Sequence, residues 1–186
     1  DHVVKAEILL HGSFATTGIG HGTDKALIAG LLGMRPDDIR IPDSFFLAKK
    51  DGMEFSFSTI TLKDAHPNTA VLRLTGEHGR KIEVQAASIG GGRILIAKLD
   101  GIEVNFSAEK PTLIVHNVDQ PGHVAQVTSM LAEKQVNIAT LQLYRDKRGG
   151  YAVMVIETDQ EVPEESVAWL EQLDGIIKVT YINVEE

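Results

Sequence analysis

Cysteine is absent from the 186 residues of this chain. Its absence excludes disulfides, a thiol nucleophile and any cysteine ligand for zinc or an iron–sulfur cluster on this chain. Long hydrophobic runs are absent too, since residues 26–34, "ALIAGLLGM", are too few to span a bilayer. The sequence has no secretory signal pattern. We therefore expect a cytoplasmic protein without a membrane partner.

Basic residues are fewer than acidic ones, with 18 Lys and Arg against 26 Asp and Glu and a formal net charge of -8. An acidic surface argues against nucleic acid as the main partner. The hydrophobic content of 43% and the charged content of 24% are typical of globular proteins. The chain begins at Asp1 rather than at Met, and a strand-like segment follows almost at once. We therefore expect a natural chain that begins upstream.

The first part of the chain is expected to be α+β, with one or two helices over a mostly antiparallel sheet. Helical spacing covers 24–32, where Thr23 or Asp24 can cap the first turn, and a second short helix ends at Gly52. The pair Asp100-Gly101 is a strong hairpin signal. Alternating hydrophobic residues predict strands at 3–10, 53–62, 69–88 (two strands around the turn "EHGR") and 92–107 (a hairpin).

The second part begins after a predicted boundary at Pro111, which gives domains at 1–108 and 111–186. Its order of predicted elements is βαββαβ, the ferredoxin-like unit. Strands are expected at 112–117, 137–146, 151–159 and 176–184, and helices at 122–135 and 163–173, the second with Pro163 at its start. The helical stripe Val124, Val127, Met130 and Leu131 is interpreted as core.

The loop from His11 to Gly33 contains several glycines, two histidines and several hydroxyls. Thr23 stands where the third glycine of G-x-G-x-x-G belongs, so a dinucleotide fold is not indicated. A glycine loop that enters a helix offers free N–H groups to an anion. His21 could transfer a proton there, with Asp24 orienting it or capping the helix. A structural turn with a cap is an equal alternative.

Two further segments are candidates in the first part. The run "HPNT", from His66, gives a rigid polar corner before a strand, although a plain turn with Asn68 bonded to its own backbone is the simpler interpretation. The run "SIGGGRI" has three successive glycines, Gly90–Gly92. They indicate either a bulge or crossover, or a place where the backbone passes close to another body.

In the second part, residues 116–126 form a turn that enters a helix, where Asp119 and Gln120 could cap and Gly122 allows a sharp turn. Loop amides there could hold a small polar ligand. The remaining histidines show no metal-ligand spacing with a carboxylate, so we interpret them as structural or surface residues: His2, His11, His78 and His116.

The loop, the "HPNT" run and the "SIGGGRI" run, in this order, resemble the beta subunit of iron–sulfur-dependent L-serine dehydratase (L-serine ammonia-lyase). The first domain is similar to the allosteric substrate binding (ASB) domain shared with one class of D-3-phosphoglycerate dehydrogenases. The second, with "VHNVDQPGHVAQVTSMLAEKQVNI", resembles an ACT domain. Together these similarities cover nearly the whole chain. The G-H-G-T-D block at Gly20–Asp24 is the most diagnostic part of the resemblance.

The resemblance implies conversion of L-serine to pyruvate and ammonia. In such enzymes a [4Fe-4S] cluster with an open iron site acts as Lewis acid, and a base removes the Cα proton. The cluster is held by cysteines of the partner alpha subunit, which agrees with the cysteine count here. The family's beta chain usually begins with a Ser-Ser-His-Thr motif, which is missing from this sequence.

The resemblance also implies roles for particular residues. His21 transfers the proton, and Asp24 orients the His21 ring. His66 and Asn68 close the site and interact with the charged groups of the substrate. Further substrate contacts fall on Gly20, Gly22, Thr23 and Gly91. In the ACT part, relatives bind ligands at the turn between first strand and first helix, often completed across a dimer. Those positions are Asn117, Asp119, Gln120, Gly122, His123, Asn137 and Ile138. Binding of serine, of another amino acid or of no ligand is open for this part, and a structural or dimerising role is slightly favoured.

The resemblance makes the alpha subunit, L-serine and a second copy of the chain the expected partners, the last through ACT or ASB domains. Two rival functions remain open. One is the detached regulatory region of a D-3-phosphoglycerate dehydrogenase, which has no evident need of His21 and Asp24 in a G-H-G-T-D block. The other is a stand-alone amino-acid sensor.

Overall fold

A computed structural model describes residues 2–107 and 109–183 of the chain. The chain divides into two compact units, Asp1–Gly101 and Ile102–Glu186. The predicted domain end at Ala108 lies outside the described residues. No helix in the described part is both long and apolar enough to cross a membrane.

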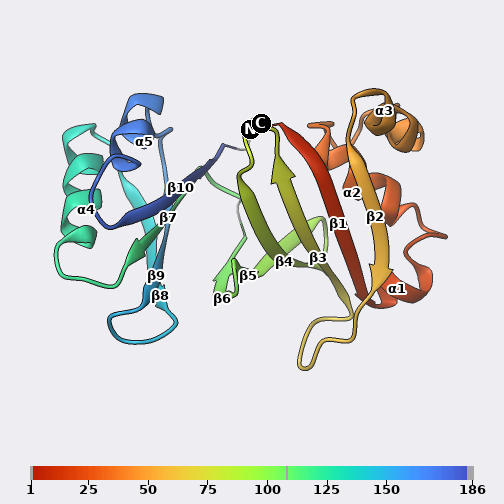
Figure 1. The fold of residues 1–186 in the computed structure, drawn as a ribbon, viewed down its shortest axis with the longest axis horizontal. Helices are drawn as coiled ribbons and strands as arrows, with labels where there is room; N and C mark the ends of the chain where they lie inside the picture. The colour runs from red at the N-terminus through yellow and green to blue at the C-terminus, as the bar shows by residue number, and fades with distance from the viewer. Residues whose placement is uncertain (1, 108, 184–186) are drawn as a thin grey trace. The chain divides into compact units, whose positions relative to one another are not determined.

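Six strands form the first sheet, in the order β2-β1-β3-β4-β5-β6 (Figure 1). The last of them, β6, follows the point at which the chain divides into units. Three α-helices and one 3-10 helix connect β1 to β2. The elements are β1 (Val3–Gly12), α1 (Ser13–Thr17), α2 (Thr23–Leu31), η1 (Ile41–Asp43), α3 (Ser44–Lys50), β2 (Glu54–Thr59), β3 (Asn68–Gly76), β4 (Lys81–Gly90), β5 (Arg93–Leu99) and β6 (Ile102–Phe106).

The helices of the first unit cover one face of its sheet because the strands alternate in polarity. On β1 the alternate residues Ala6, Ile8 and Leu10 are buried, and they cluster with Ile28 of α2 and Ala48 of α3. Aromatic rings extend this core at the edge strand, where Phe45, Phe55 and Phe57 have centroids 5.1 to 6.2 Å apart. Burial of this apolar face is what fixes the layer of helices on the sheet.

Two features of the first unit differ from the sequence prediction. Strand β2 pairs with β1 in parallel, with Lys5 opposite Glu54 and Leu10 opposite Thr59, although the sheet is otherwise antiparallel as expected. The helix α1 was not predicted, and three α-helices replace the expected one or two. The hairpin at Asp100-Gly101 is confirmed, since both residues have positive φ, 48° and 81°, as a type I′ turn requires.

The second unit contains the predicted βαββαβ order, and its sheet runs β10-β7-β9-β8. Both helices pack on one face through a buried cluster that includes Val127, Leu131 and Leu170. Val124, predicted as core, is instead 36% exposed. The α+β class is therefore confirmed. The elements are β7 (Thr112–Val118), α4 (His123–Glu133), β8 (Ile138–Arg145), β9 (Tyr151–Thr158), α5 (Glu164–Leu170) and β10 (Ile176–Ile182).

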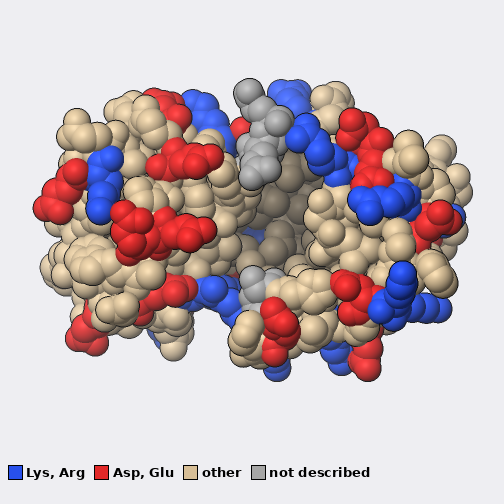
Figure 2. All heavy atoms as spheres, turned by 90° about the horizontal axis from the view of Figure 1, so that it is seen from above, with Lys and Arg blue, Asp and Glu red and all other residues tan. Residues whose placement is uncertain are grey.

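Charge is divided unequally between the two units. In Asp1–Gly101 twelve Lys and Arg balance twelve Asp and Glu, so the formal net charge of -8 belongs to residues 102–186. Figure 2 shows this difference as a predominance of red over blue on the half that contains the second unit. The surface of the second unit therefore attracts cations and cationic segments.

Candidate functional site

The sheet of the first unit brings three distant sequence motifs to one edge, which we call the motif edge. Its members are the ends of β1 and β4 and the starts of β3 and β5, so Gly12 pairs with Asn68 and Gly90 pairs with Arg93. Between these pairs, Thr69 lies opposite Ala87. The end of β1 (His11-Gly12), the "HPNT" run and the "SIGGGRI" run are therefore neighbours, although up to about eighty residues separate them in sequence.

A close backbone contact joins the first two of these motifs. Gly12 has φ 56° and ψ -124°, a conformation that is essentially restricted to glycine. The backbone N–H of Ser13 donates to the carbonyl oxygen of Pro67 over 2.8 Å. A Cβ atom on Gly12 would lie 2.5 Å from that same oxygen. Gly12 is therefore needed both for its φ and for the approach of the "HPNT" segment.

Hydrogen bonds within the "HPNT" turn hold His66 in place. Its Nδ1 accepts a hydrogen bond from the backbone N–H of Asn68 at 3.1 Å, and the Thr69 hydroxyl donates to the His66 carbonyl at 2.6 Å. A neutral imidazole that accepts at Nδ1 carries its hydrogen on Nε2. The exposed His66 ring thus offers a hydrogen-bond donor and has no free acceptor nitrogen.

His11 supports the segment that leads into this corner. Its Nδ1 lies 3.2 Å from the backbone nitrogen of Leu62 and 3.3 Å from the carbonyl oxygen of Ile60. The neutral ring can accept from Leu62, and the protonated ring can donate to Ile60. In either state His11 attaches the chain after β2 to the end of β1.

The block Gly20–Asp24 forms the turn between α1 and α2. Its amides are used within the turn: the N–H of His21 donates to Thr17 and Gly18, and that of Thr23 donates to Gly18 at 2.8 Å. The N–H of Gly22 donates to Ile19 at 3.2 Å. The expectation of free N–H groups for an anion is therefore wrong for these three amides, because backbone carbonyls already accept from them.

The predicted cap of α2 is also wrong. Gly22 occupies the N-cap position with φ 73°, and no side chain caps the helix there. The carboxylate of Asp24 instead accepts from the backbone N–H of Lys25 at 2.9 Å. This places a negative charge in the first turn of α2, where the helix dipole favours it. In the described part of the chain no hydrogen bond or ion pair joins Asp24 to His21.

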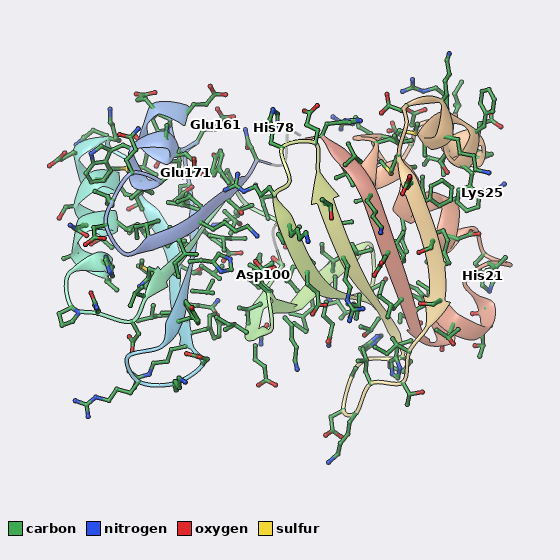
Figure 3. The ribbon with its side chains drawn as sticks, viewed as in Figure 1. His21, Lys25, His78, Asp100, Glu161 and Glu171 are labelled. Carbon is green, nitrogen blue, oxygen red and sulfur yellow. The ribbon has the colours of Figure 1, made fainter. Side chains whose placement is uncertain are left out.

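His21 is exposed, and Figure 3 shows it on the outer side of the helical layer, in the same region as Lys25. In sequence, the five-residue helix α1 and the start of the following turn lie between the end of β1 at the motif edge and His21. Among the described residues, none of the hydrogen bonds or ion pairs connects His21 with His66 or Asn68. The imidazole of His21 is therefore open to a neighbouring molecule, and both of its nitrogens are accessible to proton transfer.

The glycines of "SIGGGRI" form a hairpin turn. Gly90, Gly91 and Gly92 have φ values of 90°, 65° and 75°, which explains why glycine is required at each. A Cβ atom on any of the three would meet nothing within 4 Å. Within this chain the glycines therefore serve backbone conformation rather than close approach, and Gly91 is exposed at the tip.

The turn from β7 to α4 contains two buried polar groups with unused bonding capacity. The side-chain N–H of Asn117 donates to the Val118 carbonyl at 2.7 Å, but its buried Oδ1 has no partner among the described residues. The ring of His123 is buried, and its Nε2 also has no partner in the part of the chain that the structure describes. A Cβ atom on Gly175 would lie 2.6 Å from that ring. Buried polar atoms of this kind usually find a partner in water or a ligand.

Asp119 does not cap α4, contrary to the prediction, and neither does Gln120. The N-cap is Gly122, with φ 108° and no side-chain hydrogen bond. The Asp119 carboxylate instead accepts from the backbone N–H of Gly149 at 2.9 Å and from Arg145 at 3.2 Å. The Gly149 hydrogen bond and then the Arg145 side chain lower the pKa of Asp119. Asp119 therefore connects this turn to the loop between β8 and β9.

Acid is expected to release that loop. Because the folded-state pKa of Asp119 lies below the ordinary value of 3.8, the stabilisation is complete above that value and is lost as the pH falls further. We expect the amide shift of Gly149 to titrate in this range and to stop titrating in Asp119→Asn. The amide of Gly79, which donates to the Gly76 carbonyl, is the internal control. A Gly149 shift that follows Gly79 throughout would contradict this assignment.

Asn137 and Ile138 lie at the opposite end of the second sheet from the β7–α4 turn. Ile138 pairs with Thr158, and the neighbouring residue Glu157 is opposite Thr112 at the start of β7. The side chain of Asn137 donates to Asp159 at 2.6 Å. One chain therefore does not bring these two residues to Asn117 and His123.

No group of three His, Cys, Asp or Glu in residues 2–107 and 109–183 is placed to hold a metal ion. The sequence also has no cysteine. These residues therefore do not fit an iron–sulfur cluster held by this chain.

Comparison with known proteins identifies both parts of the chain. Residues 1–50 match the family described as "Serine dehydratase beta chain", and residues 111–175 match "ACT domain". The chain is 35% identical to "L-serine dehydratase, beta chain" of Peptoniphilus asaccharolyticus, over 97% of this chain and 82% of the relative. It is 37% identical to "Probable L-serine dehydratase, beta chain" of Bacillus subtilis (strain 168), over 94% and 79%.

D-3-phosphoglycerate dehydrogenases are similar over a smaller share of their length. The one from Methanocaldococcus jannaschii is 31% identical over 61% of this chain but only 22% of the relative. The one from Bacillus subtilis (strain 168) is 26% identical over 86% of this chain and 30% of the relative. The likeness is therefore to one region of those larger enzymes.

Proposed function

Because this chain belongs to the family of L-serine dehydratase beta chains, we propose that it is the beta subunit of an enzyme that converts L-serine to pyruvate and ammonia. The observation that carries the proposal is the match to two such beta chains over 82% and 79% of their length. The dehydrogenase alternative rests on lower identity and on at most about a third of each relative. The family assignment favours a lyase subunit over that alternative.

The beta-chain name of the relatives supports an alpha chain as the partner. We place a [4Fe-4S] cluster on cysteines of that alpha subunit, since this chain has none. When bound, such a cluster supplies a Lewis acid for the substrate hydroxyl and carboxylate.

His21 is proposed as the base that takes the Cα proton of serine. Its ring is exposed and open at both nitrogens, whereas the Nδ1 of His66 already accepts from Asn68. This difference favours His21 for accepting a proton and His66 for donating a hydrogen bond to substrate oxygen. Asp24 is proposed to orient His21 in the assembled enzyme, which requires its carboxylate to turn from the Lys25 amide.

Substrate contacts are proposed for further residues of the three motifs. Asn68 stands at the start of β3, beside Gly12, and its side chain is half-buried. The exposed hairpin tip at Gly91 lies along the same edge. In the α1–α2 turn, Gly20, Gly22 and Thr23 would contact substrate through rearranged backbone or through the Thr23 hydroxyl. This chain supplies one wall of a pocket that the alpha subunit completes.

Anaerobic co-expression with the alpha subunit tests the proposal. The purified pair is expected to form pyruvate from L-serine, while this chain alone forms none because it has no cluster ligands. The assay measures pyruvate as a function of serine concentration, with D-serine as the control substrate. A stable alpha–beta complex with a full cluster and no serine-dependent pyruvate would refute the assigned reaction.

The ACT part is proposed to bind an amino acid at the β7–α4 turn. The unpartnered Asn117 Oδ1 and His123 Nε2 favour a polar ligand there. Gly122, Asp119 and Gln120 form the rest of the turn, and Asn137 with Ile138 would come from a second copy, because one chain keeps them at the other end of the sheet. A homodimer through ACT or ASB domains is part of this proposal.

Calorimetry with L-serine on the isolated chain is the measurement for this second site. We expect saturable binding that is lost in Asn117→Ala, whose neighbours keep their backbone bonds. Asn105→Ala, at an exposed asparagine of β6, is the matched control. If serine at millimolar concentration gives no heat with either the wild type or the control, the second unit has an assembly role only.

Two further assignments accompany the proposal. The first is the domain division at 1–108 and 111–186, which the ACT match at 111–175 supports and which lies a few residues after the division at Gly101 and Ile102. The second is a cytoplasmic location, where thiols such as the cluster ligands proposed for the alpha subunit are kept reduced. Fractionation of cells that express the tagged chain measures the second.

A further inference from the structure

Two side-chain hydrogen bonds that run in opposite directions fix the "HPNT" turn. The ring of His66 accepts at Nδ1 from the backbone N–H of Asn68, and the hydroxyl of Thr69 donates to the backbone carbonyl of His66 at 2.6 Å. Both are local bonds between side chain and backbone, of the kind that stabilises turns. The first bond orients the imidazole, and the second holds the backbone that carries it.

Thr69 is the anchored member of this pair. It is 2% exposed, whereas His66 is an exposed residue. On β3 it lies between two neighbouring strands, opposite His11 of β1 and opposite Ala87 of β4. Because strand pairing on both sides fixes the backbone of Thr69, its hydroxyl is a donor in a fixed place. The bond to the His66 carbonyl therefore attaches an exposed histidine to the rigid part of the sheet.

The backbone just before Thr69 offers no substitute for this bond. Pro67 has no backbone N–H to donate, and its carbonyl oxygen accepts from Ser13. The backbone N–H of Asn68 is used by the Nδ1 of His66. Removal of the Thr69 hydroxyl therefore takes away the donor that holds the His66 carbonyl and leaves the backbone of His66 freer to rotate.

We propose that Thr69 is a positioning residue for His66, and that its buried hydroxyl sets the direction in which the imidazole presents its Nε2–H to the substrate. The inference rests on the proposed function, in which His66 donates a hydrogen bond to a substrate oxygen. A donor of this kind lowers the barrier when it is already aimed at the oxygen on which charge develops. A displacement of about 1 Å can lower turnover ~100-fold.

Thr69→Val removes the hydroxyl and keeps the branched shape of the side chain. In the assembled alpha–beta enzyme it is expected to lower kcat about tenfold or more. KM should change little, because the lost alignment matters most in the transition state. Thr69→Ser keeps the donor and is expected to restore most of the turnover. A serine variant as slow as the valine variant would show that the hydroxyl is not responsible and would overturn the proposal.

Thr112→Val is the matched control. Thr112 is also buried, stands at the start of a strand, and donates its hydroxyl to a nearby backbone carbonyl, that of Lys110, at 2.8 Å. The two valine variants should lose similar stability in urea unfolding, because each leaves one carbonyl without its donor. Only Thr69→Val should lose turnover. Equal turnover in the two variants would leave Thr69 a structural role alone and overturn the proposal.

A double-mutant cycle measures whether Thr69 acts through His66. In a His66→Ala background, Thr69→Val is expected to cause no further loss of kcat, because no imidazole remains to be aimed. The same loss of kcat with and without the imidazole would show that Thr69 acts by another route, which would overturn the proposal.

Nitrogen NMR of the His66 ring in this chain alone tests the positioning without the reaction. In mildly alkaline solution, where imidazole is neutral, the wild type should show one tautomer, with its hydrogen on Nε2. In Thr69→Val the two ring shifts should move towards each other as the tautomers exchange.

Unchanged ring shifts in Thr69→Val would overturn the proposal. A hydrogen on Nδ1 in the wild type would overturn it even if the valine variant does not fold. An alpha–beta complex with a full cluster that forms no pyruvate would refute the proposed function instead, and the ring shifts would still decide whether Thr69 orients His66.

Discussion

Replacing His21 by asparagine in the assembled enzyme is expected to abolish serine turnover while the subunits still associate. A positioned general base contributes ~10²–10⁴-fold to proton transfer, and asparagine has no nitrogen that can take a proton at neutral pH. The fold should tolerate the change, because the His21 ring is exposed and its backbone N–H bonds to Thr17 and Gly18 are unaffected. Steady-state pyruvate formation and gel filtration of the complex are the two measurements.

His78→Asn is the matched control. This histidine is also exposed, with Glu77 3.8 Å from its ring, but it lies in the turn between β3 and β4, at the opposite end of those strands from the motif edge. Figure 3 labels both histidines at separate parts of the first unit. The control should keep the turnover of the wild type. Normal turnover in His21→Asn would remove this residue from the mechanism.

Replacing Gly12 by alanine is expected to damage both stability and activity. The residue has φ 56° and ψ -124°, and a Cβ atom would lie 2.5 Å from the Pro67 carbonyl oxygen. Strain of this type and the forced shift of a backbone segment together cost ~3 kcal/mol in free energy of unfolding. The shift displaces the corner that holds His66, and a displacement of about 1 Å can lower turnover ~100-fold.

Gly33→Ala separates the two effects. Gly33 also has positive φ, 75°, but a Cβ atom there would meet nothing within 4 Å. It should lose about 1 kcal/mol of stability through backbone strain alone and keep its turnover number. Urea unfolding measures the stabilities, and turnover at saturating serine is compared at a temperature where both variants are folded. Equal turnover in the two variants would show that the Gly12–Pro67 contact has no bearing on catalysis.

Much of the fold was predictable because it depends on local pattern. The Asp100-Gly101 hairpin follows from two residues that tolerate positive φ, and the βαββαβ order follows from hydrophobic periodicity. The parallel pairing of β1 with β2 did not follow. Buried and exposed residues alternate along both strands in the same way for parallel and for antiparallel pairing. The parallel arrangement is selected by α2 and α3, which connect the two strands and pack on one face of the sheet.

The candidate site was predictable as a set of segments but not as a geometry. The glycines and histidines of the three motifs are visible in the sequence, yet the contact of Gly12 with Pro67 crosses more than fifty residues. The helix α1 has only five residues, which is too short for a helical hydrophobic period to be recognised in the sequence. The capping expectations for Asp24 and Asp119 failed because each carboxylate has a different amide in reach, that of Lys25 and that of Gly149.

The sequence by itself determined the α+β class, the absence of cysteine ligands, the acidic balance and the family. These properties depend on composition, on periods of two and of 3.6 residues, and on motifs read along the chain. Only the tertiary structure decided that the motifs meet at one edge and that His66 accepts at Nδ1 while His21 is open. Those features depend on pairing across long sequence separations, where packing of the whole unit selects among partners that are locally equivalent.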